Sequence, residues 1–483
     1  MKASVISLSL SISVGTVVYA QDIQYPNPFK HVIVVFQENR TPDNLFQGLC
    51  SPPYGNSSSC SITPSATQYD IQTNNWLDKK APGGTITPGV VPLGNTYDLS
   101  HAHSAFIVEY DGGKMDGAAG VPCSGSCPPN PQFRYVDNSS GILNPYLDLA
   151  TQYGWGNNMF QTNQGPSYPA HQFIFGGTSA PSAADDSKGI FVAENPGNTQ
   201  GGGVGCLAPL NEYDWLISPG TAPNEYKLVN NPLGTLCFSR PTMATLIDKA
   251  KLTWKYYTSS PDGIWTAPNT IREICDPNSD YTKCTGPQWV NNVDKKSADV
   301  LSDIAACKLA DVSWVIPAGQ NSDHPGSPHT TGGPSWVASI VNAVGLDTKC
   351  EGGKGYWSDT AIVITWDDWG GWYDHVPPPI LKHNQSDYQY GIRVPLIVVS
   401  TYTPERYINN VSPHDFGSIL RFIEGTFGIK EGSLGFADAR ASNDLEGFFN
   451  FKQTPRRFKK IAAEYDANYF LNDTSPPEPP DND

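Results

Sequence analysis

Four short runs of apolar residues stand out along the chain, and each stops at polar or turn-forming residues. They are HVIVVFQ (31–37), SWVIP (313–317), AIVITW (361–366) and VPLIVVS (394–400). They are rich in β-branched residues and apolar on both faces, a pattern typical of strands buried inside a parallel sheet. We therefore predict buried parallel strands at these positions; the run at 313–317 follows the pattern less completely than the others.

Between these runs, apolar residues recur at helical spacing. One such segment is SRPTMATLIDKAKL, where Ser239 is the expected N-cap and Pro241 lies in the first turn. The others are SADVLSDIAACKLA (297–310), PSWVASIVNAVG (334–345) and SPHDFGSILRFIEGTF (412–427). Strands that alternate with helices predict an α/β fold, with a central, mostly parallel sheet flanked by helices.

Two long stretches fit neither template. Residues 51–96 and 176–235 are rich in Gly, Pro, Asn and Ser, and we interpret them as ordered insertions, some of them held by disulfides. Because the predicted strands and the polar residues at their ends extend from residue 31 to about 425, one large domain over residues 21–465 is expected. The segment 466–483 ends in SPPEPPDND and is expected to be a disordered tail.

The first twenty residues have the pattern of a secretory signal peptide. Lys2 precedes an apolar, Ser-rich run, and small residues lead up to Gln21, so cleavage is expected after Ala20. The run is too short and too polar for a membrane span, and no later segment is a candidate for one. A secreted or periplasmic protein with no transmembrane segment is therefore predicted.

The overall charge argues against polyanionic partners. The formal net charge is −16, and it becomes −17 when Lys2 is removed with the signal peptide. An acidic chain of this kind is a poor candidate for binding nucleic acid or an anionic membrane through its overall field. An anionic substrate would have to be attracted by a local cluster or by a metal ion.

The ten cysteines favour disulfides, because their number is even, the chain carries an export signal, and paired C-x-x-C ligand spacings are absent. The simplest pairing joins each cysteine to its nearest neighbour along the chain: 50–60, 123–127, 206–237, 275–284 and 307–350.

Acidic and amide side chains follow two of the predicted strands. Glu38 and Asn39 come directly after the strand at 31–37, and Asp367 and Asp368 follow the strand at 361–366. Ligands bind at the carboxyl ends of strands in such sheets, and three carboxylates gathered there need a compensating cation. Oxygen ligands suit a hard or borderline divalent metal ion. The alternative is that the two aspartates form an exposed acidic turn or cap the following segment.

Other candidate residues lie in polar loops. Ser167 lies in a Gly/Pro turn that could present its hydroxyl to a site, although exposed loop serines are common. His101 and His324 lie among Asp, Ser and Gly residues, where an imidazole can contact a phosphoryl group or act as a general acid. Structural roles remain the alternative for either histidine.

Five segments together resemble the phosphoesterase family, which includes bacterial phospholipase C enzymes, plant non-specific phospholipase C and secreted acid phosphatases, and which belongs with the alkaline-phosphatase-like folds. The segments are HVIVVFQENRTPDNLF, HSAFIVEYDGGKMDG, GPSYPAHQ, ITWDDWGGWYDHVPPP and GIRVPLIVVS. They appear in the family's order over roughly residues 28 to 430.

The resemblance implies a set of roles. Glu38, Asn39, Asp367 and Asp368 would hold one divalent metal ion beside the nucleophile Ser167, and His101 and His324 would contact the phosphoryl or leaving group. Lys114, His375 and Arg40 are expected to contact the substrate, with a solvated surface charge as the alternative for Lys114.

The implied function is a secreted, metal-dependent phosphoesterase that forms a covalent phosphoserine. Its substrate would be a phosphomonoester or a phospholipid headgroup. The chain departs from the phospholipase pattern, in which Thr is followed by Pro-Asn-Arg, because Ser167 is followed by Pro169, Ala170 and His171. That departure favours the acid phosphatase branch. The alternative function is an inactive secreted binding protein on the same scaffold.

Overall fold

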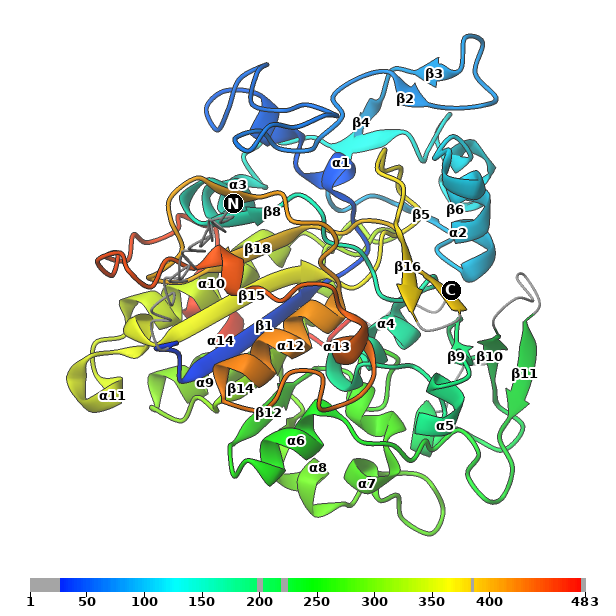
Figure 1. The fold of residues 1–483 in the computed structure, drawn as a ribbon, viewed down its shortest axis with the longest axis vertical. Coiled ribbons are helices and arrows are strands. Elements are labelled where there is room, and N and C mark those ends of the chain that lie inside the picture. The colour runs from blue at the N-terminus through cyan, green and yellow to red at the C-terminus, as the bar shows by residue number, and fades with distance from the viewer. Residues whose placement is uncertain (1–26, 198–202, 219–224, 384–385, 479–483) are drawn as a thin grey trace, which may run out of the picture.

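A computed structural model describes residues 27–197, 203–218, 225–383 and 386–478. The expected signal peptide at 1–20 lies outside the described residues. An eight-stranded mixed sheet forms the centre of the molecule, with strand order β13-β12-β14-β1-β15-β18-β8-β19 (Figure 1). Its strands are β13 (Val293–Asp294), β12 (Trp254–Tyr257), β14 (Val312–Val315), β1 (His31–Gln37), β15 (Thr360–Trp366), β18 (Leu396–Val399), β8 (Gly154–Gly156) and β19 (Tyr407–Asn409).

The predicted strands are all present, but one runs in the opposite direction. β1 pairs in parallel with β14 on one side and with β15 on the other. β18 is antiparallel to both of its neighbours, so the prediction of a parallel strand at 394–400 is wrong. The hydrophobic run could not reveal this direction, because a strand buried on both faces has the same pattern either way.

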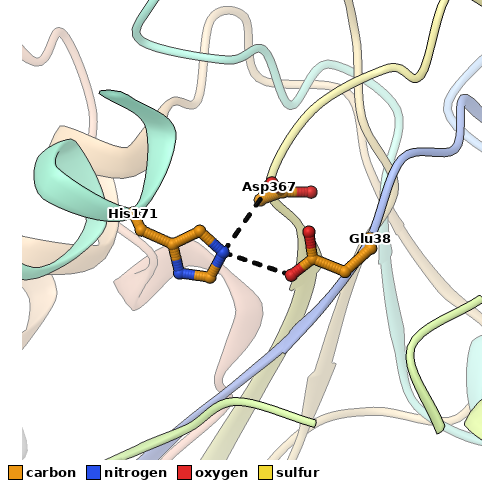
Figure 2. Close-up of side chains that lie close together, drawn as sticks. All are labelled: Glu38, His171 and Asp367. Carbon is orange, nitrogen blue, oxygen red and sulfur yellow. Dashed lines mark hydrogen bonds and ion pairs between the residues drawn. The ribbon is translucent and has the colours of Figure 1, made fainter. Parts of the chain in front are cut away.

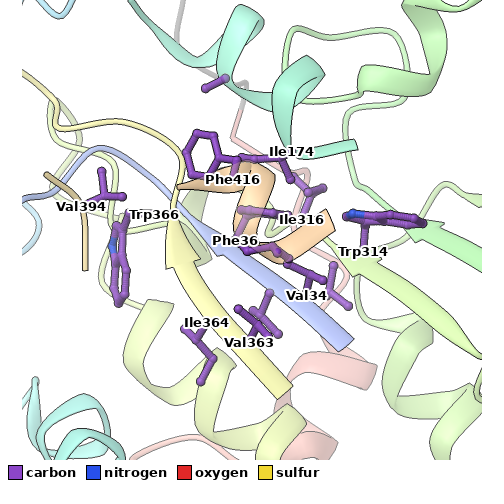
Figure 3. Packing of buried hydrophobic residues seen from close by; sticks show 14 of the residues in the cluster. Val34, Phe36, Ile174, Trp314, Ile316, Val363, Ile364, Trp366, Val394 and Phe416 are labelled. Carbon is purple, nitrogen blue, oxygen red and sulfur yellow. The ribbon is translucent and has the colours of Figure 1, made fainter. Parts of the chain in front are cut away.

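Two groups of helices cover the sheet. One group contains α3 (Asn144–Gln152), α9 (Asp299–Ala305), α10 (Gly333–Leu346) and α14 (Ala467–Asn472); the other contains α4 (Ser167–Gly176), α6 (Met243–Lys249), α12 (Phe416–Thr426) and α13 (Ala437–Arg440). Figure 3 shows Ile174 of α4 and Phe416 of α12 close to Phe36 of β1, in the layer between helices and sheet. The expected α/β class with helices flanking the sheet is confirmed.

Two local expectations need correction. Ser239 does not cap α6; the N-cap is Thr242, whose backbone N–H donates to Thr245 Oγ1 at 3.1 Å, while Ser239 donates its hydroxyl proton to Glu273. The segment expected to be a disordered tail contains α14, whose Phe470 is 2% exposed and packs edge-on against Trp336. An apolar contact of this kind fixes a short terminal helix that its polar surroundings in the sequence do not suggest.

The described parts of both insertions are folded, and disulfides cross-link them. All five disulfides join nearest neighbours along the chain, as predicted. The second insertion contributes a separate antiparallel sheet of β9 (Phe191–Val192), β10 (Tyr213–Ile217) and β11 (Tyr226–Val229), on the right of Figure 1. Within the described ranges, every helix is too short or too polar to cross a membrane.

Candidate active site

Neighbouring strand ends bring two acidic residues together. In the register of the sheet, Gln37 at the end of β1 lies opposite Trp366 at the end of β15. The residues that follow, Glu38 and Asp367, therefore leave the sheet side by side, and the backbone N–H of Asp367 donates to the carbonyl oxygen of Gln37 at 2.9 Å. The backbone N–H of Glu38 donates to Ser322, in the loop after β14, at 2.8 Å. The segments that follow the adjacent strands β14, β1 and β15 therefore meet at one edge of the central sheet.

The Trp-Gly-Gly turn after the aspartates permits this close approach. Gly370 has φ 63°, and a Cβ atom there would lie 2.4 Å from the carbonyl oxygen of Asn39. Gly371 has φ 68°, and its Cβ would lie 2.7 Å from the carbonyl oxygen of Ser100, next to His101. Only glycine combines a left-handed backbone with such contacts. The turn therefore fits against the backbone of both segments.

The three carboxylates at this edge are shielded from water. Glu38, Asp367 and Asp368 are each 0% exposed. Burial raises the pKa of Glu38 to about 8, and burial followed by the nearby charge of Glu38 raises the pKa of Asp367 to about 7. Burial and the charge of Asp367 raise the pKa of Asp368 to about 8. Ionising all three in this environment requires a compensating positive charge.

Helix α4 directs two side chains at these acids. Ser167 is the first residue of α4, and its Oγ lies 3.1 Å from Asp368 Oδ2 and 3.3 Å from Glu38 Oε2. His171, one turn later, places Nε2 3.1 Å from Glu38 Oε1 and 3.7 Å from Asp367 Oδ2 (Figure 2). Burial lowers the pKa of His171 to about 4, so its ring is neutral at physiological pH.

Several buried polar atoms at this position have no hydrogen-bond partner among the described residues. They are Asp367 Oδ2, Asn39 Oδ1 and His171 Nδ1. One ligand atom each from Glu38, His171 and Asp367 lies within 4.8 Å of the others. Because unpaired buried oxygens are costly, and because oxygen donors with one imidazole suit a divalent cation, these residues fit a metal ion.

Asn39 connects this cluster to two histidines. Its φ of 60° is left-handed, a conformation that Asn tolerates better than most residues. Its Nδ2 lies 3.2 Å from Nε2 of His101 and 2.9 Å from Nε2 of His324. The Nδ1 atom of each ring faces a backbone carbonyl, that of Leu99 for His101 and that of Pro325 for His324. Nδ1 therefore carries the proton in both rings, and Nε2 is turned toward the site.

The Phosphoesterase family matches residues 29–430 of this sequence, which is more than half of the chain. The chain belongs to the Phosphoesterase family.

Its relatives include phospholipases. The non-hemolytic phospholipase C of Pseudomonas aeruginosa is 25% identical over 288 residues, which cover 50% of this chain and 40% of that protein. Phospholipase C B of Mycobacterium tuberculosis is 23% identical over 472 residues, or 89% of this chain and 79% of that protein. The chain therefore spans less than half of the Pseudomonas relative. A solved protein of the alkaline phosphatase superfamily from Vibrio parahaemolyticus shares 11% identity and a TM-score of 0.33, with 83% of this chain and 80% of that one covered.

Arg40 is buried, and its guanidinium group donates hydrogen bonds to backbone carbonyl oxygens. Its Nε donates to the carbonyl oxygen of Asp323 at 2.9 Å and its Nη2 to that of Leu93 at 2.8 Å. Its guanidinium carbon lies 5.1 Å from the ring centroid of Trp372. These contacts join Arg40 to the loops around it, and its contact with substrate stays a prediction.

Lys114 and His375 also have other partners. Lys114 Nζ lies 3.3 Å from Asp111, and its side chain is 68% exposed, so it is the solvated surface charge that was the alternative. His375 lies between Asp43 and Asp70, with Nδ1 2.7 Å from the first and Nε2 3.0 Å from the second. In the described part of the chain, no hydrogen bond or ion pair connects either residue with the acids Glu38, Asp367 and Asp368.

The residue that sequence reasoning missed is His171. It was noticed only as a departure from the Pro-Asn-Arg pattern. The available signal was its spacing: Ser167 and His171 are four residues apart, and such residues lie on one face of a helix. A helix that begins at Ser167 therefore points both side chains in one direction.

Proposed function

We propose that the protein is a secreted phosphoesterase that hydrolyses a phosphate ester through a covalent phosphoserine at Ser167. The observation that carries the proposal is the position of the Ser167 hydroxyl, which is buried at the first residue of α4 within hydrogen-bond distance of Glu38 and Asp368. The start of a helix is a favourable place for negative charge, whether on a serine oxygen or on a phosphoryl group.

Glu38, Asn39, Asp367, Asp368 and His171 would hold a divalent cation. When bound, such an ion offsets the charge of the carboxylates and of the phosphoryl oxygens and lowers the pKa of a nearby hydroxyl. We include His171 among the ligands because its Nε2 faces Glu38 and Asp367. A site built from oxygen ligands alone would give no reason for that position of the ring.

The chain's own residues account for the proton and bond changes. As Ser167 Oγ attacks phosphorus it passes its proton to Asp368 Oδ2, to which it donates a hydrogen bond, and the bond from phosphorus to the ester oxygen breaks. That oxygen takes a proton from Nε2 of His101 or His324, whose ring enters the step as an imidazolium and leaves it neutral. Water then attacks the phosphoserine and gives one proton to the same Nε2, the bond between phosphorus and Oγ breaks, and Oγ regains its proton from Asp368. Since Nδ1 of each histidine is committed to a backbone carbonyl, Nε2 is the atom that exchanges the proton.

Two substrate classes fit this chemistry. The phospholipase relatives support cleavage of a phospholipid headgroup, whereas Ser167 with Pro169, Ala170 and His171 supports a phosphomonoesterase. The five disulfides support an oxidising compartment outside the cytosol.

The test offers the purified protein an aryl phosphomonoester and phosphatidylcholine vesicles, with chelator and after restoration of divalent metal, and identifies the phosphorus product. Metal-dependent release of inorganic phosphate from the monoester, or of phosphocholine from the vesicles, is expected and distinguishes the two classes. Ser313→Ala serves as the control, because Ser313 is a buried serine of β14 whose hydroxyl has no partner among the described residues. If neither substrate gives a phosphorus product after the metal is restored, the proposal is overturned and a binding protein is favoured.

A further inference from the structure

A second group of possible metal ligands lies outside the cluster around Glu38. It consists of His103, the first residue of α2 (His103–Tyr110), Glu194, which follows β9, and Glu225, which immediately precedes β11. One ligand atom from each lies within 4.8 Å of the others. The three residues come from segments far apart in the sequence, and none of them belongs to the active site described above.

The hydrogen bonds around His103 assign its tautomer. Gln164 donates from Nε2 to the carbonyl oxygen of Gln389 at 2.8 Å, which fixes the orientation of its amide. Its Oε1 therefore faces His103 Nε2, at 3.4 Å, and the proton of the ring belongs on Nε2. A histidine that binds a metal through one nitrogen commonly donates the other N–H to a carbonyl oxygen.

The other nitrogen of His103 faces a carboxylate. Nδ1 lies 2.7 Å from Glu225 Oε1. With Nε2 protonated, Nδ1 in the neutral ring is a lone pair that points at an anion, and this contact is unfavourable without a cation between or beside the two atoms. Either a second proton makes the ring an imidazolium, or a metal ion takes the lone pair.

The charges favour the metal ion. Glu194 Oε1 accepts from the backbone N–H of His103 at 2.8 Å, so both glutamates contact His103, Glu194 at its backbone and Glu225 at its ring. Neither glutamate has an ion pair with Lys or Arg among the described residues, and a single imidazolium would leave one of them uncompensated.

We propose that His103, Glu194 and Glu225 bind a second divalent metal ion of the zinc type. One imidazole nitrogen and two carboxylates suit Zn²⁺ better than Mg²⁺ or Ca²⁺, which prefer oxygen ligands alone. The ion would fasten the insertion that carries β9 and β11 to the start of α2. Since His101 is two residues before His103, the same ion would hold the backbone next to that histidine in place.

The test counts zinc in the full-length mature protein after dialysis against zinc-containing and then zinc-free buffer. The wild type is expected to retain one zinc ion more per chain than Glu225→Gln and Glu194→Gln, and the exposed control Glu405→Gln is expected to retain as many as the wild type. Asp368→Asn, which affects the other site, should also retain the ion bound to His103. The proposal is therefore separable from the phosphoesterase proposal, which can fail while the second ion remains.

Equal zinc counts in the wild type and in both glutamate variants would overturn the proposal and make His103 an imidazolium paired with Glu225. If either variant fails to fold, as judged by circular dichroism, diffraction from wild-type crystals at the zinc absorption edge decides the question. An anomalous peak bounded by His103 Nδ1 and the two carboxylates is expected, and its absence in zinc-loaded crystals would contradict the proposal.

Discussion

Two groups of buried acids lie at the same edge of the sheet, and they differ in whether side chains of the protein compensate their negative charges. We call the first the carboxylate cluster; it consists of Glu38, Asp367 and Asp368. We call the second the arginine cluster; it consists of Arg393, Asp43, Asp70, Asp374 and His375. The edge is shared because β18, which begins just after Arg393, is antiparallel to β15. Both groups are shielded from water, but only one of them contains its own cations.

In the arginine cluster every acid faces a positive group of the protein. Arg393 donates from Nε and Nη2 to the two oxygens of Asp374, each at 3.0 Å. Its Nη1 lies 3.5 Å from Asp70, and His375 bridges Asp70 and Asp43. Such a network is complete as folded, and it holds the loop after β15 against the rest of the sheet edge.

Among the described residues, the histidine that lies against Glu38 and Asp367 is His171, whose pKa is lowered to about 4 by burial and which is therefore neutral. Asp367 Oδ2 has no hydrogen-bond partner in the described part of the chain. A structural group of acids can thus be distinguished from a candidate binding site: its negative charges are compensated by cationic side chains of the same chain, whereas a binding site would take its cation from solution.

The largest expected effect is on the free energy of unfolding, which substitutions in the two clusters should lower by different amounts. Asp374→Asn should lower the free energy of unfolding by about 3–5 kcal/mol, because it leaves a buried guanidinium without its bidentate partner. Asp367→Asn in chelator-treated protein should cost far less, since it removes a charge that Glu38 repels. Urea unfolding in the presence of chelator measures both. Equal losses would mean that the carboxylate cluster is also a structural network.

The second prediction concerns metal affinity. Asp367→Asn should weaken the divalent ion bound beside Ser167 by roughly a hundredfold or more, because even residues that only support metal ligands cost 10–100-fold when they are changed. His375→Gln, from the arginine cluster, is the control and should bind the metal as the wild type does. Competition with a metal indicator measures the two affinities, and a similar loss in both variants would remove the distinction.

The smallest effect depends on pH. Burial alone would lower the pKa of His375, but the carboxylates of Asp43 and Asp70 raise it to about 9. A folded-state pKa above the ordinary value of 6.5 stabilises the protein fully below pH 6.5, and this contribution is lost as the pH rises through 9. His375→Gln should therefore cost about 1–3 kcal/mol near pH 6 and less near pH 10. Unfolding measured at both values tests this; a pH-independent loss would contradict it.

The residues that could be predicted from sequence are those whose position follows from strand ends. Glu38 and Asp367 come together because parallel strands end at one edge, and the hydrophobic runs locate those ends. Arg40 lies three residues after the end of β1 and His375 nine residues after the end of β15, and they point at other partners. Their side-chain directions depend on loops such as that containing Asp43, which no local pattern describes.

The contribution of α4 was only partly visible in the sequence. Ser167 was identified through its resemblance to a known motif, while His171 needed a helix that starts at Ser167, and two prolines at 166 and 169 obscure that start. The direction of β18 was likewise hidden, because its residues are buried on both faces. Tertiary packing, rather than local preference, fixed each of these features.

The central claim is that Ser167 is the nucleophile beside a metal-binding carboxylate cluster. The most direct measurement quenches the protein with acid during turnover of a phosphate ester and locates the covalent phosphoryl group by peptide mass spectrometry. We expect the group on Ser167, its disappearance with chelator, and loss of turnover by at least about a thousandfold in a folded Ser167→Ala variant. Turnover close to wild type in Ser167→Ala, or a phosphoryl group on another residue, would contradict it.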